Sequence, residues 1–377
     1  MEDISFIQQY MDKMREIQRL IIEFIENDEI SNENFNDLID YFNKQNIKDN
    51  KHELKSLLHL ISKIADNHQR AHDFFSKIEQ IIKLFHKEIN KYFSNFCVFN
   101  IFKNNKRILL FLLREKIIIP EKSIFLIISN DKYKERFYPQ YFYPEFKYYF
   151  DRNLAEEVKS EISKIDPIVY NQMRENGEND SYICQLIQKD LVEEFVTYVN
   201  QTNLSLSDTI IKPSIFETNL FLFKNKEVSL IEYAAFFGSI QIFQFLRLSN
   251  VKLTPSLWLY TIHSKNADLV HLLENNELKP KDESFIDCYL ESAKCHHNDF
   301  MNYILENYYK LESNEKILGF PLFYNFGSTT DEFTEVDVNS FCGFCKNDYF
   351  TIVEFILKNK LVDLSSKTVF NNYFFFE

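Results

Sequence analysis

A pair of short apolar helices that recurs along the second half of the chain constrains the fold more than any other feature. In residues 229–246, two apolar stretches flank a turn centred on Gly238. The same pattern, once in a weaker form, returns in residues 186–195, 256–273, 292–304 and 344–356. One such pair cannot bury its apolar faces alone, so neighbouring pairs must stack and cover one another. The sequence therefore predicts an all-α fold whose latter part is a solenoid of helical hairpins.

Asparagines at the end of each second helix support this register. Asn276, Asn307 and Asn359 fall in one column of the aligned units, and Asn250 lies one place later. The chain must turn back there toward the next unit, which requires a residue that tolerates left-handed backbone. Asparagine takes that conformation where glycine is scarce. We therefore expect the asparagines of this column to be left-handed.

The first part of the chain also has the period of amphipathic helices. In residues 1–27, apolar side chains recur at steps of three and four, and similar stretches follow at 33–45, 51–65, 70–94 and 104–117. We interpret residues 1–130 as an N-terminal helical domain. Residues 131–175 are expected to form an aromatic linker and a helix, because Pro139 and Pro144 interrupt the first part of that segment. The repeat array is assigned to 176–366 with an insertion at 315–337, and 367–377 is a C-terminal tail.

The best-formed unit resembles the ankyrin repeat. Residues 229–246 match its paired alanines on the inner helix, its glycine between the helices and its apolar outer helix. The later units depart from that pattern, because Lys265, His296 and Asp348 stand where the first unit has Gly238, and no intact Thr-Pro-Leu-His turn occurs. The chain is more similar still to an expanded family of ankyrin-like proteins in parasitic protists that carry a domain of unknown function. That likeness covers roughly 95–360 and is carried by residues 177–184, 214–219, 229–240, 253–258 and 295–299.

This resemblance implies repeat-mediated protein binding inside the cell, without an established reaction. In ankyrin proteins the partner usually meets the inner-helix ends and the turns beside them. By resemblance, the partner-binding residues here are Phe236, Phe237, His263, Ser264, Lys294, Cys295, Lys346 and Asn347. The insertion at 315–337 is a second place where a partner could be held, or a spacer that only covers the stack.

Composition narrows the function classes. Forty-three basic and 56 acidic residues give a net charge of −13, which repels phosphate backbones and argues against a nucleic-acid partner. The aromatic segment 131–150 also contains lysines that would suit a single-stranded nucleic acid, but acidic residues nearly cancel their charge. Only 5 glycines occur, and they form no phosphate-binding loop. We expect no membrane span, no secretory signal, and a cytoplasmic or nuclear protein with reduced cysteines.

Two alternatives to a binding scaffold remain. Cys342 and Cys345 have the spacing of metal ligands or of a redox pair, and Cys295 with His296 could complete a zinc set. The repeat alignment instead places Cys345 where an inner helix packs against its neighbour. An enzyme of unknown class is the other alternative, but no serine has the spacing of a nucleophile elbow. We therefore predict a non-catalytic protein–protein interaction scaffold without a cofactor.

Overall fold

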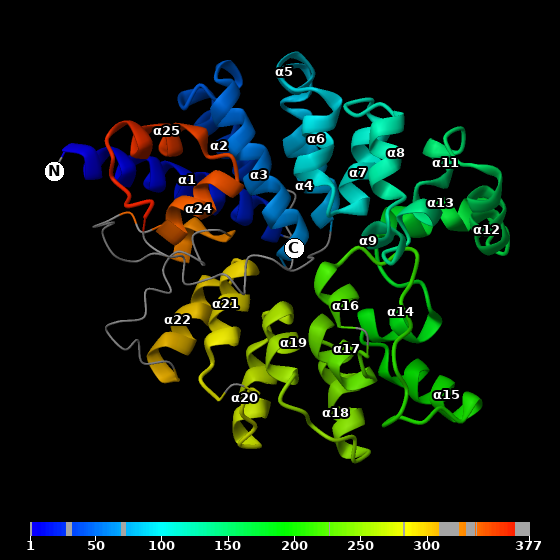
Figure 1. Ribbon diagram of the computed structural model, residues 1–377. Coiled ribbons are helices and arrows are strands. Elements are labelled where there is room, and N and C mark those ends of the chain that lie inside the picture. Colours follow the sequence, from blue (N-terminus) through cyan, green and yellow to red (C-terminus); the bar gives the residue numbers. More distant parts are fainter. Residues whose placement is uncertain are drawn as a thin grey trace. The chain divides into compact units, whose positions relative to one another are not determined.

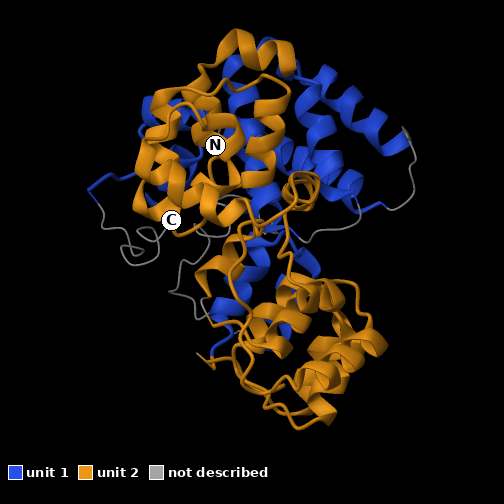
Figure 2. Ribbon diagram, turned by 90° about the vertical axis from the view of Figure 1, so that its right-hand side faces the viewer, with its two compact units in different colours: residues 1–85, 284–377 blue, residues 86–283 orange. Residues whose placement is uncertain are grey.

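The computed structural model describes residues 2–27, 32–68, 73–225, 227–281, 283–308, 324–328, 336 and 338–365 (Figure 1). Across these residues the regular structure is helical, and the only β-type pairing is an isolated bridge between Ile210 and Ser229. The predicted all-α class is therefore confirmed. None of the helices in the described part combines the length and the apolar run that crossing a membrane requires. The chain divides into two compact units, residues 1–85 with 284–377 and residues 86–283 (Figure 2).

Unit 1 consists of the two ends of the chain. Its N-terminal elements are α1 (Glu2–Glu26), α2 (Asn32–Lys44), the 3-10 turn η1 (Ile47–Asp49), α3 (Lys51–Asn67) and α4 (Phe74–Lys83). Its C-terminal elements are α21 (Ile286–Lys294), α22 (Asn298–Asn307), η2 (Phe326–Ser328), α24 (Val338–Lys346) and α25 (Phe350–Lys358). The amphipathic pattern of residues 1–27 is confirmed, because Ile7, Met11 and Ile21 of α1 are at most 1% exposed.

The two chain ends share one core in unit 1. Helix α25 packs against α3, and η2 packs against α1. The rings of Phe6 and Phe355 stack with their centroids 4.1 Å apart, and those of His52 and Phe350 stack at the same distance. Apolar faces of the N-terminal helices are therefore covered by helices that lie more than two hundred residues later in the sequence.

Unit 2 is continuous in sequence. Its first elements are α5 (His86–Tyr92), α6 (Asn95–Phe102), α7 (Lys106–Arg114), α8 (Lys122–Ile128), α9 (Asp131–Lys134), α10 (Tyr138–Tyr141), α11 (Tyr143–Phe146), α12 (Arg152–Ile162) and α13 (Pro167–Asn176). They are followed by α14 (Tyr182–Gln188), α15 (Val192–Thr202), α16 (Leu220–Lys224), α17 (Leu230–Phe237), α18 (Ile240–Leu248), α19 (Leu257–Ser264) and α20 (Ala267–Asn275).

The aromatic segment forms three short helices, and a proline lies in the first turn of both α10 and α11. Proline is tolerated there because the first helical N–H groups have no partner in the helix. The side chains of Tyr138, Tyr141 and Phe142 are at most 1% exposed, so these aromatic rings belong to the core. Tyr148 and Tyr149 are exposed, at 86% and 38%.

Each of the five predicted helix pairs is present, as α14–α15, α17–α18, α19–α20, α21–α22 and α24–α25. In unit 2, first helices pack in sequence order, α14 on α17 and α17 on α19, and the second helix α15 packs on α18. The compact units have different bounds from the expected segments, because the first 85 residues share a core with the last two helix pairs. Most of the predicted insertion at 315–337 and all of the tail at 367–377 lie outside the described residues.

Candidate functional site

The turns inside the five helix pairs share one backbone geometry. A residue with positive φ follows each first helix, and the five are Asp190 (50°), Gly238 (71°), Lys265 (52°), His296 (61°) and Asp348 (54°). In four of these turns the next N–H donates to a carbonyl five residues earlier, as in Ser239 to Ala234 at 2.9 Å and Tyr349 to Phe344 at 3.0 Å. The alignment of Lys265, His296 and Asp348 with Gly238 is therefore a structural equivalence, and the missing glycines did not change the turn.

The prediction for the asparagine column was wrong. Asn276 and Asn359 have φ of −95°, and the left-handed residue is the next one in both cases, Glu277 or Lys360. Asn250, which the alignment placed one position late, is itself left-handed at 63°. The column asparagines instead donate through Nδ2 to the carbonyl four residues earlier, at 2.7 Å for Asn276 and 2.9 Å for Asn359. Each of these carbonyls also accepts the backbone N–H of the same asparagine, at 3.2 Å for Asn276 and 3.1 Å for Asn359, so the side chain adds a second bond at the helix end.

Hydrogen bonds between successive turns hold the hairpins of unit 2 in register. The carboxylate of Asp190 accepts from the backbone N–H groups of Gln241 and Ile242 at 3.0 and 2.9 Å, at the start of α18. An acidic side chain is stabilised at a helix N-terminus by the free N–H groups and by the helix dipole. In the next turn, the Asn266 side chain donates to the Gly238 carbonyl at 3.4 Å. A methyl group added at Gly238 would lie 3.2 Å from Ser264 Cβ.

Helix α16 covers the inner-helix ends of unit 2. The ring of Phe221 lies 6.0 Å from that of Phe236, 4.9 Å from that of Tyr260 and 4.2 Å from that of His263. Phe236 is 9% exposed and His263 is 5% exposed. A partner cannot reach these side chains while α16 is in place. The ankyrin pattern contains no such helix between units, so the resemblance gave no signal for this cover.

The other expected partner residues are divided between the surface and the core. Ser264 is buried and donates to the Thr261 carbonyl at 2.8 Å, and Cys295 and Asn347 are at most 1% exposed. Phe237, Lys294 and Lys346 are reached by solvent. These three residues are the part of the expected set that can contact a partner in this conformation.

The cysteines do not converge. Cys342 and Cys345 both lie on α24, partly exposed and exposed, whereas Cys295 is fully buried at the end of α21. Within the part of the chain that the structure describes, neither Cys342 nor Cys345 belongs to a group of three or more possible metal ligands. Burial, followed by the nearby Cys342 and Asp348, raises the pKa of the Cys345 thiol. A redox nucleophile requires the opposite shift.

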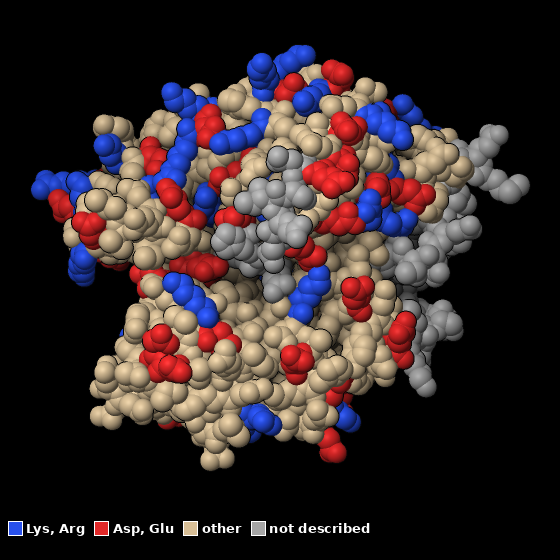
Figure 3. Space-filling view, turned by 180° about the vertical axis from the view of Figure 1, so that it is seen from behind, with Lys and Arg blue, Asp and Glu red and all other residues tan. Residues whose placement is uncertain are grey.

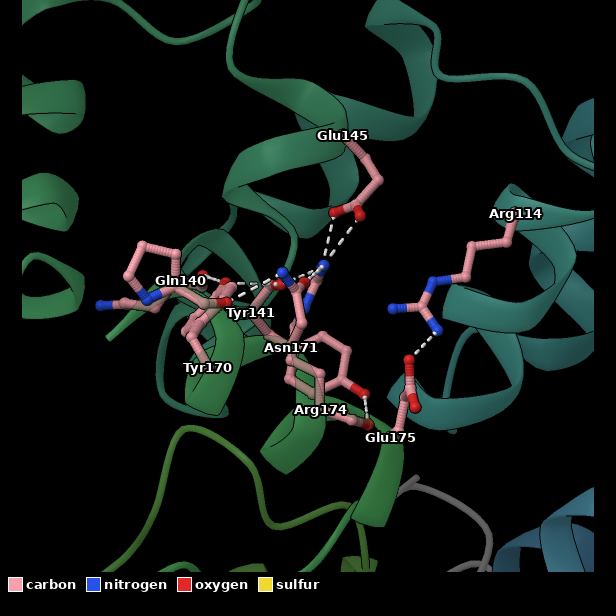
Figure 4. Close-up of polar contacts among 9 residues, drawn as sticks. Arg114, Gln140, Tyr141, Glu145, Tyr170, Asn171, Arg174 and Glu175 are labelled. Carbon is pink, nitrogen blue, oxygen red and sulfur yellow. Dashed lines mark hydrogen bonds and ion pairs between the residues drawn. The ribbon is translucent and has the colours of Figure 1, made fainter. Parts of the chain in front are cut away.

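A buried polar network in unit 2 was not foreseen from the sequence (Figure 4). Arg174 of α13 donates to both carboxylate oxygens of Glu145 at 2.9 and 2.8 Å and to the Tyr141 carbonyl at 3.0 Å. In return, the Tyr141 hydroxyl donates to the Arg174 carbonyl at 2.6 Å. The Tyr170 hydroxyl donates to the carbonyls of Gln140 and Tyr141. Burial, the largest cause, raises the pKa of both tyrosines, so they remain neutral donors. The network fastens the aromatic segment to α13.

Lys106 forms a second buried centre in unit 2. Its side chain is fully buried, and Nζ donates to the carbonyls of Arg136 at 3.1 Å and Ile215 at 2.6 Å. Nζ also lies 5.0 Å from the ring centre of Tyr141 and 4.9 Å from that of Phe223. Carbonyl oxygens and aromatic faces are both attractive surroundings for a cation. No sequence signal marked this lysine, because lysine within a helix is ordinarily read as a solvent-exposed residue.

Acidic and basic side chains are interspersed on the face shown in Figure 3, and neither sign forms a continuous field there. Two cavities in unit 2, one beside Phe99 and Leu109 and the other beside Asn179 and Tyr233, have volumes of about 10 and 20 Å³. Each has room for about one water molecule.

Comparisons of the chain with models of protein families, with curated proteins and with solved structures found no match.

Proposed function

We propose that this protein is a non-catalytic scaffold that binds another protein through an ankyrin-like array of helical hairpins. The observation that carries the proposal is the shared turn at Asp190, Gly238, Lys265, His296 and Asp348. A conformation that is unfavourable for lysine, histidine and aspartate is kept at the same place in five hairpins. Stacked hairpins present extended surfaces, and repeat proteins bind partners through such surfaces.

The buried polar contacts and the surface charges support a binding role. The cavities beside Phe99 and Asn179 hold about one water molecule each, so neither of these two is a substrate pocket, which usually encloses about 300–1,000 Å³. In the network around Arg174, the side chains of Arg174 and Tyr141 each donate to the other residue's backbone carbonyl, so these groups hold the fold together. The interspersed charges in Figure 3 favour a protein surface over a phosphate backbone as the partner.

The partner contacts that we propose are the solvent-reached members of the expected set, Phe237 of α17, Lys294 of α21 and Lys346 of α24. Phe237 packs on Tyr233 with ring centres 4.8 Å apart and keeps part of its ring in solvent. An aromatic ring of this kind supplies apolar contact area to a partner. Lys346 is the most exposed of the three and supplies a charge that steers a partner of opposite sign.

Affinity purification of the full chain from its source cells, with cross-linking and mass spectrometry, tests this function. We expect a stoichiometric protein partner whose recovery falls about tenfold with Lys346→Glu, a loss of about 1.4 kcal/mol in binding. Lys358→Glu is the matched control, because Lys358 is 69% exposed on the next helix of the same hairpin. Equal recovery by the two variants would remove Lys346 from the interface. Absence of any stoichiometric partner would overturn the proposed function.

A further inference from the structure

Three buried histidines meet inside unit 1. His68 follows α3, whereas His296 and His297 form the turn between α21 and α22. The three side chains belong to residues that are at most 3% exposed. The ring centre of His68 lies 5.9 Å from that of His296 and 5.5 Å from that of His297. The cluster therefore joins an N-terminal helix of unit 1 to a C-terminal hairpin.

The hydrogen bonds assign different roles to two of the rings. His68 Nδ1 donates to the Cys295 carbonyl at 2.8 Å, and its Nε2 lies 3.2 Å from the Glu26 carboxylate. An oxygen atom therefore lies within 3.2 Å of each ring nitrogen of His68. His296 Nε2 donates to the Tyr324 carbonyl at 3.0 Å. A neutral ring can make that bond, because it keeps one N–H.

The surroundings of His296 disfavour a positive charge on its ring. Burial, followed by the nearby His68, lowers the pKa of His296 to about 3. Lys63 of α3 lies close enough to lower it further, and both Lys63 and Lys294 of α21 sit over the ring of Tyr324. Two carboxylates lie near the cluster. Glu291 of α21 pairs with Lys294 and, after burial, helps to raise the pKa of the Cys295 thiol. Glu26 of α1 is the carboxylate that faces His68.

We infer that His68, His296 and His297 form a pH-sensitive clasp, which holds the α21–α22 turn on the end of α3 near neutral pH and releases it in mild acid. The ring nitrogens of the three histidines do not converge on one point as metal ligands would. We therefore assign to this cluster a response to protonation. Release would loosen the hairpin α21–α22 before the rest of the chain unfolds.

The direction of the pH effect follows from proton binding in the two states. An unfolded histidine takes up a proton as the pH falls below about 6.5, whereas His296 in the fold does not until about pH 3. The opened state therefore binds more protons, and it gains population as the pH falls from about 6.5 toward 3. Well below pH 6.5, one such histidine multiplies the opening constant about tenfold per pH unit, which amounts to about 30-fold between pH 7.5 and pH 5.0.

Hydrogen exchange of the full chain, followed by mass spectrometry with EDTA present, tests the clasp. After correction for intrinsic exchange rates, we expect protection of residues 286–307 to fall about 30-fold from pH 7.5 to pH 5.0. His296→Asn removes the titrating ring and keeps a residue that tolerates positive φ. The loss of protection over the same pH range should therefore stay under about threefold in this variant. His271→Gln is the control, because that histidine is 62% exposed on α20 and should leave the wild-type response unchanged.

An equal loss of protection in wild type and His296→Asn would overturn the proposal. If the variant does not fold, the wild-type chain still decides the matter through NMR of 13C-labelled histidine rings. We expect one buried ring that does not titrate above pH 5. Titration of all nine histidines between pH 6 and 7 would overturn the clasp.

Discussion

Two arginines of unit 2 make the same kind of ion pair in opposite surroundings (Figure 4). The Arg174 side chain is 3% exposed and its partner Glu145 is 17% exposed, whereas Arg114 and Glu175 are 40% and 50% exposed. Water solvates the second pair in the folded and unfolded states alike. The first pair has lost that solvation and depends on its hydrogen bonds.

Replacing Arg174 and replacing Arg114 should therefore lower the free energy of unfolding by very different amounts. Arg174→Met leaves the half-buried carboxylate of Glu145 without its cation and removes a buried guanidinium from its carbonyl contacts, and we expect a loss of about 3 kcal/mol in the free energy of unfolding. Arg114→Met, the matched control, should cost less than about 1 kcal/mol. Urea denaturation followed by circular dichroism measures both values. Adding Glu145→Gln to Arg174→Met should recover part of the loss, and similar costs for the two single variants would contradict this account.

The helical hairpin shows how a repeat persists after its sequence pattern has been lost. Glycine remains in one of the five turns, yet all five keep a positive φ at that position. Lysine, histidine and aspartate pay a conformational penalty there of about 1–2 kcal/mol. Packing of successive helices, as in α17 against α19, supplies the compensation.

Glycine substitutions should expose that penalty. Lys265 has φ of 52° and an exposed side chain, so Lys265→Gly should raise the free energy of unfolding by about 0.5–1 kcal/mol. Gln244→Gly in the exposed middle of α18 should instead lower it by about 1 kcal/mol. Thermal unfolding of both variants beside wild type tests the assignment. A loss of stability with Lys265→Gly would mean that the turn is not strained.

At the scale of the whole molecule, the two units differ in how the chain builds them. Residues 86–283 form unit 2 from one continuous segment. Unit 1 needs both ends of the chain, because Phe6 packs on Phe355, and the Glu53 carboxylate of α3 accepts from Lys13 at 2.6 Å and from Thr351 at 3.0 Å. Its N-terminal helices therefore lack part of their cover until the last hairpin has been made.

Fragments should behave accordingly. Residues 86–283 expressed alone should unfold in one cooperative thermal transition, because their own core is complete. Residues 1–85 alone should show no such transition and should gain one on addition of residues 284–377. Calorimetry of each fragment and of the mixture decides this. Cooperative unfolding of residues 1–85 by themselves would contradict the shared core.

The sequence by itself determined where the long amphipathic helices and the five hairpins lie, because apolar period and helix breaks are local properties. It did not reveal α6, α8 or α16, and the stretch 70–94 that it presented as one helix forms α4 and α5. It also identified the equivalence of Lys265 and Asp348 with Gly238. Only the tertiary structure decided which carbonyls the column asparagines bind and that Phe221 covers the inner-helix ends. It alone brought His68 to His296. Such contacts join residues far apart in the chain, and their burial depends on the final packing, which a one-dimensional pattern does not contain.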